Sequence, residues 1–203
     1  MNFHISRLVL TASLACFAAH APVFAADKPA ADKPTVGGAY DNNLELQGIK
    51  FHVSCPNQGS LNRLTIVPAG LTGENKKIEV EVDGTVTGAE VEDLNADGSP
   101  EIYVYTQGAG SGSYGAVIAY AANKKKSLSQ VSLPDLADDK KAAKGYMGHD
   151  EFAVVENRLV RRFKLYNEGD TNAKPTGKTR QISYRLEAGE AGWILRLDKV
   201  VDY

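Results

Sequence analysis

Apolar residues recur at every second position along most of the chain from Leu44 onward, in short runs separated by turn-forming residues. This period of two places alternate side chains on one face of a β-strand, whereas a helix needs a period near 3.6 residues. Short strands at this spacing predict a sandwich or barrel, and we expect an all-β fold, an antiparallel β-sandwich with one short helix. The expected strands are Leu44–Cys55, Leu61–Pro68, Lys77–Val82, Thr85–Asp93, Glu101–Thr106, Ala116–Ala121, Ser127–Ser132, Glu151–Glu156, Leu159–Tyr166, Thr179–Leu186 and Gly192–Val201.

One segment breaks the alternation and predicts the helix. Between Pro134 and Lys144, proline stands where a first turn tolerates it, acidic residues fill the first half and lysines the second, and Gly145 follows. Hairpin turns are expected at Asp83-Gly84, Glu156-Asn157 and Ala188-Gly189.

The N-terminal stretch reads as a targeting segment. Residues 1–25 contain one basic residue, Arg7, then the apolar run Leu8–Ala19, then Val23-Phe24-Ala25, which fits a signal-peptidase site. A lipid anchor at Cys16 is disfavoured because Ser13 stands where processing prefers leucine. We therefore expect a cleaved signal peptide (1–25), a solvated Ala/Asp/Lys/Pro tether (26–38), and a single domain (39–203) in the periplasm.

Charge and cysteine content narrow the classes of partner. The chain has a net charge of −2, and loss of Arg7 with the signal makes it one unit more negative. This balance predicts no nucleic-acid partner and no membrane insertion. Only Cys55 would remain, and we expect it to be buried, because it ends an apolar-patterned segment. Trp193 alternates with leucines and is expected in the core.

The stretch Gly108–Gly115 carries serine, glycine and one tyrosine between two expected strands. Its glycines permit a tight turn and leave the hydroxyls of Ser111 and Ser113 and the ring of Tyr114 uncovered, so it predicts a display loop. A plain glycine-rich hairpin connection is the alternative. Gly110, Gly112 and Gly115 match a dinucleotide-binding fingerprint, but a strand follows where that motif needs a helix, which excludes it.

A second motif concerns metal binding. Asp93, Asn95 and Asp97 stand at alternate positions before Gly98, as in the first half of a calcium loop. An EF-hand is excluded because Val104 occupies the position of its last glutamate and no helices flank the loop. Asp93, Asn95 and Asp97, with Glu101, could still hold calcium in a β-turn. The alternative is an Asx-rich turn that binds nothing.

An enzymatic reading depends on His149. Beside Asp150 and Glu151, it could act as a base for a serine hydroxyl. No G-x-S-x-G elbow accompanies it, so we favour a structural histidine and no enzymatic activity. The Gly177-Lys178-Thr179 ending of a phosphate loop is rejected, because Asn172 stands where that motif needs glycine.

The motif Ser111-Gly112-Ser113-Tyr114 resembles the serine-glycine-x-tyrosine signature of the periplasmic lysozyme inhibitors. The segments Gly145–Phe152 and Gly169–Ala173 look most like the branch that acts on invertebrate-type (i-type) lysozyme. The resemblance implies a β-sandwich that inserts the loop carrying this motif into the lysozyme cleft. We expect no cofactor other than the calcium ion considered above.

Among the residues that the resemblance marks as lysozyme-binding, Ser111 and Tyr114 match best, with Gly112 and Ser113 between them. A second motif of related inhibitors is altered in this chain. Lys178 is therefore assigned to the lysozyme-binding residues only because it lies near the altered motif. The expected function is inhibition of lysozyme to protect peptidoglycan. The alternative is a calcium-binding scaffold. The resemblance and exposed edge strands also suggest a homodimer.

Overall fold

The computed structural model describes residues 38–203 of the chain. The expected signal peptide and all of the expected tether except Gly38 lie outside this range. Within it the chain is almost entirely β-structure in two sheets, which confirms the all-β prediction. No helix in the described range is long and apolar enough to cross a lipid bilayer.

The first sheet is an antiparallel meander of four consecutive strands. It comprises β1 (Tyr40–Leu46), β2 (Ile49–Cys55), β3 (Leu61–Ala69) and β4 (Ile78–Asp83). In β2, Ile49, Phe51, Val53 and Cys55 are buried and alternate with more exposed residues, as the period of two requires. One face of this sheet is therefore the core face, and Cys55 lies on it with 2% of its surface exposed.

The second sheet has the strand order β5-β6-β7-β8-β12-β11-β10-β9. Its strands are β5 (Thr85–Glu92), β6 (Glu101–Gln107), β7 (Gly115–Asn123), β8 (Ser127–Ser132), β9 (Glu151–Val155), β10 (Arg158–Lys164), β11 (Thr179–Gly189) and β12 (Gly192–Asp202). All neighbours are antiparallel except β8 and β12, which pair in parallel through Val131–Trp193 and Ser132–Ile194. That pairing is the one departure from a purely antiparallel sandwich among the described strands.

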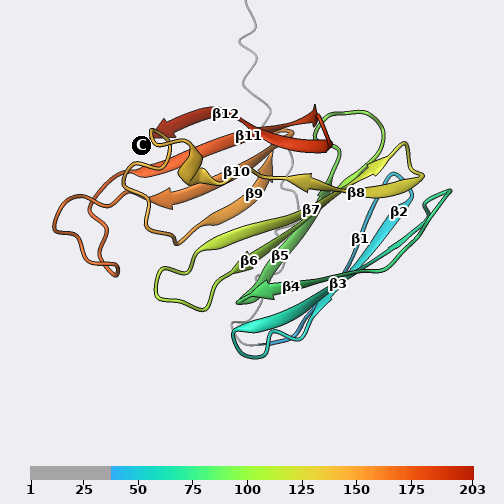
Figure 1. Ribbon diagram of the computed structural model, residues 1–203, viewed down its shortest axis with the longest axis horizontal. Coiled ribbons are helices and arrows are strands. Elements are labelled where there is room, and N and C mark those ends of the chain that lie inside the picture. Colours follow the sequence, from blue (N-terminus) through green and yellow to red (C-terminus); the bar gives the residue numbers. More distant parts are fainter. Residues whose placement is uncertain (1–37) are drawn as a thin grey trace, which may run out of the picture. The chain divides into compact units, whose positions relative to one another are not determined.

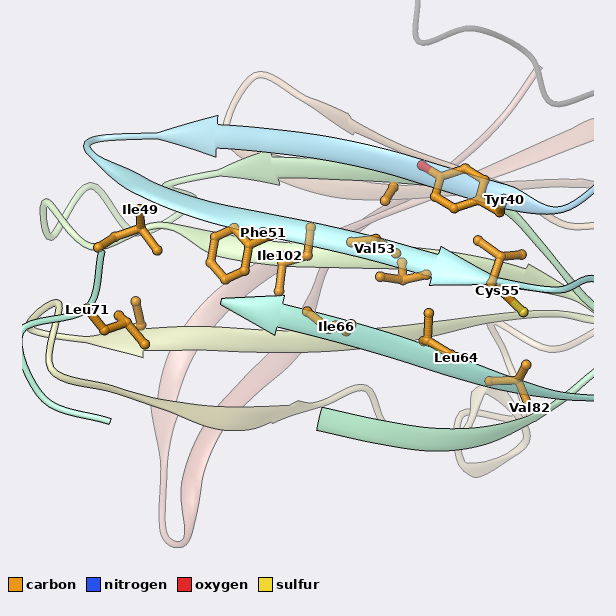
Figure 2. Close-up of a cluster of buried hydrophobic side chains, with 14 residues drawn as sticks. Tyr40, Ile49, Phe51, Val53, Cys55, Leu64, Ile66, Leu71, Val82 and Ile102 are labelled. Atoms are coloured by element: carbon orange, nitrogen blue, oxygen red, sulfur yellow. The ribbon is translucent and has the colours of Figure 1, made fainter. Parts of the chain in front are cut away.

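Two apolar clusters fill the structure. The first lies between the four-stranded sheet and one face of β5–β7, where Phe51, Val53 and Ile66 meet Ile102 (Figure 2). The second lies on the opposite face of β6 and β7, where Tyr103 and Tyr105 meet side chains of β10, β11 and β12. The strands consequently form three levels in Figure 1, with β5–β8 between β1–β4 and β9–β12.

Strand β6 is buried on both faces because it lies between these two clusters. Every residue from Glu101 to Thr106 is buried, and even-numbered and odd-numbered side chains enter different clusters. The curl of the large sheet also brings its two edge strands together, since the Val154 amide of β9 donates to the Glu90 carboxylate of β5 at 2.6 Å. The loop after β6 therefore begins at the end of a strand that is packed on both faces.

The expected helix at Pro134–Lys144 is largely wrong. The structure has one 3-10 turn, η1 (Leu136–Asp138), followed by irregular turns. Aspartate side chains compete for the backbone: Asp135 accepts from the Ala137 amide, and Asp139 accepts from Lys141 and Ala142. Arg180 donates to the carbonyls of Lys141, Ala142 and Lys144, which would also lack backbone partners at the end of a helix over these residues.

The turns were predicted with mixed success. Glu156-Asn157 forms the expected two-residue hairpin, with both residues at positive φ. Asp83-Gly84 is instead the corner where the chain passes from one sheet to the other. The last hairpin turns at Glu190-Ala191, two residues later than predicted, and the expected strand Leu44–Cys55 is two strands joined at Gln47-Gly48.

Trp193, which was expected in the core, is only half-buried, and its indole N–H donates to Asn123 at 2.9 Å.

Candidate functional site

The loop Gly108–Gly115, called the motif loop below, connects β6 to β7. The last paired residues of the hairpin are Gln107 and Gly115. Inside the loop, the Gly108 amide donates to the Tyr114 carbonyl and the Ser113 amide donates to the Gly110 carbonyl, both at 2.9 Å. Ser113 has a φ of 42°, a left-handed conformation that this closed turn imposes. The loop therefore has a defined internal shape.

Two of the side chains singled out in the sequence are displayed at the tip of the motif loop. Ser111 is exposed, and 55% of the Tyr114 surface is exposed, a large fraction for an aromatic residue. The Tyr114 ring lies directly over Gly112, where a Cβ atom would overlap ring carbons. Glycine at this position thus lets the ring fold back along the loop. Gly112 and Ser113 are only partly exposed.

The motif loop rests on the segment Gly145–Asp150, which the sequence had linked to the same family. The His149 amide donates to the Gly112 carbonyl at 2.8 Å, and the Gly115 amide donates to the Asp150 carboxylate at 2.8 Å. Gly148 has a φ of +91°, and a Cβ there would overlap the Gly112 carbonyl oxygen. The close approach of the two segments therefore requires glycine at position 148.

Below this contact lies a buried polar cluster. Arg161 of β10 donates to Asp150 at 2.7 Å, and the two side chains are 8% and 0% exposed. Arg161 also donates to the Tyr146 hydroxyl, which donates to Asp150, both at 2.6 Å. Burial lowers the pKa of Arg161, but the hydrogen bond and charge of Asp150 outweigh it and raise the pKa overall. Arg161 is therefore a permanent cation under the loop.

A third segment, Tyr166–Gly177, reaches the motif loop from the other side. The Asn172 side-chain amide donates to the Ser111 carbonyl, and the Tyr166 hydroxyl donates to the Asn172 carbonyl at 2.8 Å. Within this segment Asp170 accepts from the backbone amides of Thr176 and Asn167, which lower the pKa of its carboxyl. The segment therefore holds its own shape and fixes the Ser111 end of the loop.

Lys178 follows this segment, immediately before β11. Its side chain is exposed, and its backbone carbonyl accepts from the Leu165 amide at 2.8 Å. Of this segment and Lys178, it is Asn172 that donates a hydrogen bond to the motif loop. The structure thus joins Ser111, Gly112 and Tyr114 to the segments at 145–150 and 172, and gives Lys178 no hydrogen bond to them.

His149 lies near the motif loop but is not arranged as a catalytic base. Its Nε2 atom lies 3.3 Å from the side-chain oxygen of Asn172. The neighbouring carboxylate of Asp150 points the other way, to Arg161 and Tyr146. Among the described residues, no serine hydroxyl is hydrogen-bonded to this imidazole. The arrangement favours the structural role expected from the sequence.

The calcium-loop-like turn lies between β5 and β6. Ligand atoms of Asp93, Asp97 and Glu101 lie within 4.8 Å of one another. Asp93 accepts from the amides of Asp97 and Gly98, and Asn95 accepts from that of Asp97, as in an Asx-rich turn. Glu101 is 1% exposed, and burial together with the charges of Asp93 and Asp97 raises the pKa of its carboxyl to about 8.

The supporting residues were harder to read from sequence than the displayed ones. Arg161 stands in an alternating strand and looked like an ordinary charged strand residue, so its role under the loop was missed. Tyr146 and Asp150 belong to the segment that carried the resemblance. The available signal for Arg161 was an arginine in a buried strand that faces this segment. Asn172 lies in Gly169–Ala173, the second segment that carried the resemblance, but as a single residue it was noted for breaking a phosphate-loop pattern.

Comparison with known proteins adds one match. A family model described as "Periplasmic lysozyme inhibitor of I-type lysozyme" matches residues 74–145, which confirms the resemblance seen in the sequence. The matched range includes the motif loop and the Asp93–Asp97 turn and ends before Arg161, Asn172 and Lys178. The family's description is of an inhibitor located in the periplasm. No curated protein and no solved structure gave a match.

Proposed function

We propose that this chain, which matches the periplasmic inhibitors of I-type lysozyme over residues 74–145, inhibits such a lysozyme by inserting the motif loop into its substrate cleft. The single observation that supports this most is the exposed Ser111–Tyr114 tip on a loop held at three points. A rigid, aromatic-tipped projection loses little conformational entropy on binding, which favours its use as an interface anchor.

The chemistry of the cleft suits the displayed groups. Lysozymes hold a pair of carboxyl groups in a groove shaped for sugar, and one of the pair is kept protonated. The Ser111 hydroxyl can donate to the carboxylate and accept from the protonated acid, in place of a substrate hydroxyl. Tyr114 adds apolar contact with the cleft wall and one hydrogen bond. Because Asn172 holds the Ser111 carbonyl, the serine hydroxyl is the group free to enter the cleft.

The proposal also covers where the inhibitor acts and which residues lie at the edge of its binding surface. The inhibitor acts in the periplasm after removal of residues 1–25, where it protects peptidoglycan. Lys178 is a peripheral contact at most, because the central part of the surface is formed by the motif loop. Met147 is 40% exposed and stands between Tyr146 and Gly148, which both contact the motif loop, so it would extend the apolar part of this surface.

The deciding experiment is a lysis assay. Lysis of cell walls by invertebrate-, chicken- and goose-type lysozymes is measured with the wild-type protein and with Ser111→Ala/Tyr114→Ala. Inhibition of the invertebrate type is expected for the wild type, and Tyr114→Ala alone should weaken it by about 2 kcal/mol or more, the scale of an interface hot spot. Val67→Ala, an exposed apolar residue on β3, is the control and should inhibit as wild type. Equal inhibition by the wild type and the double variant would exclude the motif loop as the lysozyme-binding surface. No inhibition by the wild type would exclude lysozyme inhibition as the function.

A calcium-binding scaffold is the second candidate, favoured by the close approach of Asp93, Asp97 and Glu101. A bound divalent cation would neutralise the buried Glu101 carboxylate and stabilise the fold in proportion to its binding. The unfolding temperature is compared in calcium, magnesium and a chelator. A rise specific to calcium that Asp97→Asn abolishes and Asp138→Asn retains would support this site. Equal unfolding temperatures in calcium and chelator would exclude it.

A further inference from the structure

We infer that Asp150, Arg161 and Tyr146 are positioning residues that hold the motif loop in its displayed shape. The contribution of this cluster to lysozyme binding rests on the proposed function, whereas its effect on the loop does not. The three residues come from two parts of the chain: Tyr146 and Asp150 precede β9, and Arg161 lies in β10.

The contact with the loop is made through its backbone. Gly115 is the first residue of β7, and its amide donates to Oδ2 of Asp150 at 2.8 Å. A Cβ atom on Gly115 would lie 2.7 Å from Cβ of Asp150 and 3.0 Å from the Phe152 ring, so the two segments approach as closely as glycine permits. The carboxylate thus fixes the point where the motif loop enters the strand.

The carboxylate is itself immobilised from below. Arg161 Nε donates to Oδ1 of Asp150, Arg161 Nη2 donates to the Tyr146 hydroxyl, and that hydroxyl donates to Oδ2 of Asp150. The three side chains therefore form a closed ring of charge-assisted hydrogen bonds. The guanidinium also stacks over the rings of Tyr146 at 4.8 Å and Phe152 at 5.4 Å. Arg161 lies in the buried part of β10, so this ring of hydrogen bonds is anchored in the second apolar cluster.

Tyr146 connects the same cluster to the displayed aromatic side chain. Its ring meets Tyr114 edge-on at a centroid distance of 5.7 Å, and it packs against Phe163 at 4.7 Å. The cluster therefore supports the C-terminal end of the tip twice: the Tyr114 ring rests on Tyr146, and the Gly115 amide on Asp150. A buried ion pair is weak support for stability in itself, since apolar replacements are often as stable. Its position under the loop indicates a role in fixing conformation.

The test uses a variant that removes the ion pair without leaving a lone buried charge, Asp150→Ala/Arg161→Met. The matched control is Glu187→Gln/Arg196→Met, which removes another arginine–carboxylate pair, between β11 and β12 near their connecting turn, at the end of β11 opposite to the Tyr166–Gly177 segment. Native-state hydrogen exchange of the Gly115 and Ser113 amides is measured with the unfolding temperature and the inhibition of I-type lysozyme. In the first variant we expect exchange at these amides to rise about tenfold or more and inhibition to weaken similarly, as for loss of one charge-assisted hydrogen bond. The control should change neither.

Tyr146→Phe is a milder second variant that keeps the ring and removes only the hydroxyl. It should raise exchange at Gly115 by a smaller factor and remain folded, so a failure of the double variant to fold leaves the inference testable. Unchanged exchange at Gly115 in either folded variant, or an equal rise in the control, would overturn the positioning role. If the wild type inhibits no lysozyme, the proposed function fails, while the exchange data still decide whether the cluster holds the loop.

Discussion

At the scale of single residues, Gly112 and Gly110 provide a direct test of how the motif loop displays its aromatic ring. Neither glycine has a positive φ, so alanine is compatible with the backbone at both. A Cβ atom at position 112 overlaps the Tyr114 ring, whereas at position 110 nothing lies within 4 Å. We expect Gly112→Ala to displace the ring and weaken inhibition about tenfold or more, given the typical energy of an aromatic anchor.

Gly110→Ala is the matched control and should keep the Tyr114 ring in place. The ring position is followed by its proton chemical shifts, which report contact with Tyr146, and inhibition is measured in parallel. Identical Tyr114 shifts in the two variants would show that the ring does not lie against Gly112.

The displayed residues were accessible to sequence analysis because display has a local signature. Ser111 and Tyr114 stand among glycines between two alternating segments, and that pattern alone predicts exposure. The residues that support them have no local signature. Arg161 meets Asp150 only because β9 and β10 form a hairpin, and its contact with Gly115 through Asp150 joins distant parts of the chain. Such pairings depend on sheet order, which periodicity does not encode.

At the scale of elements, Gly148 and Gly169 test whether the segment before β9 must touch the motif loop. Both have a left-handed φ, +91° and +87°, so alanine costs about 1 kcal/mol of backbone strain at either position. Only at Gly148 does a Cβ also overlap the Gly112 carbonyl. We expect Gly148→Ala to lower the free energy of unfolding by clearly more than Gly169→Ala and to weaken the His149–Gly112 hydrogen bond.

Urea unfolding of the two variants measures this difference. Hydrogen exchange at the His149 amide shows whether the lost stability comes from that contact. Equal destabilisation by the two substitutions would mean that the segments can separate at no cost.

Strands were predicted well, and two of the three expected hairpins join the expected strands, β9 with β10 and β11 with β12. The period of two marked β3 and β4 through their alternating side chains, and the chain did form those strands. The Asp83-Gly84 dipeptide has the composition of a hairpin, yet it forms a corner between the sheets because β5 pairs with β6 instead of β4. The helix before Gly145 was predicted from charge placement, but Asp135 and Asp139 accept from amides two or three residues further on and divide the segment into turns. A pairing distant in sequence decided the outcome at Asp83-Gly84, whereas local side-chain hydrogen bonds decided it for the helix.

At the scale of the whole described structure, the buried Glu101 links stability to pH. Its carboxyl pKa in the folded state is about 8, above the ordinary value near 4.3. Between these values the folded chain retains a proton that the unfolded chain releases, so the free energy of unfolding falls as pH rises and becomes level above about 8. Glu101→Gln should be less sensitive to pH over this range.

The measurement is urea unfolding at about pH 5, 7 and 9 in the presence of a chelator, for wild type and Glu101→Gln. The chelator matters because a bound cation would favour the charged carboxylate. The same pH dependence in both proteins would assign the effect to other groups.

The parallel pairing of β8 with β12 constrains the order in which the chain can assemble. Strands β1–β8 are made first, but β8 obtains its second neighbour only when Trp193 and Ile194 arrive, near the end of the chain. Leu195, fully buried in the second cluster, arrives with them. Strand β8 and the second cluster therefore stay incomplete until translation has passed Leu195, long after the motif loop itself has been made. A chain that stopped before Trp193 would carry every displayed residue, yet β8 would lack its second neighbour and the second cluster would lack Leu195.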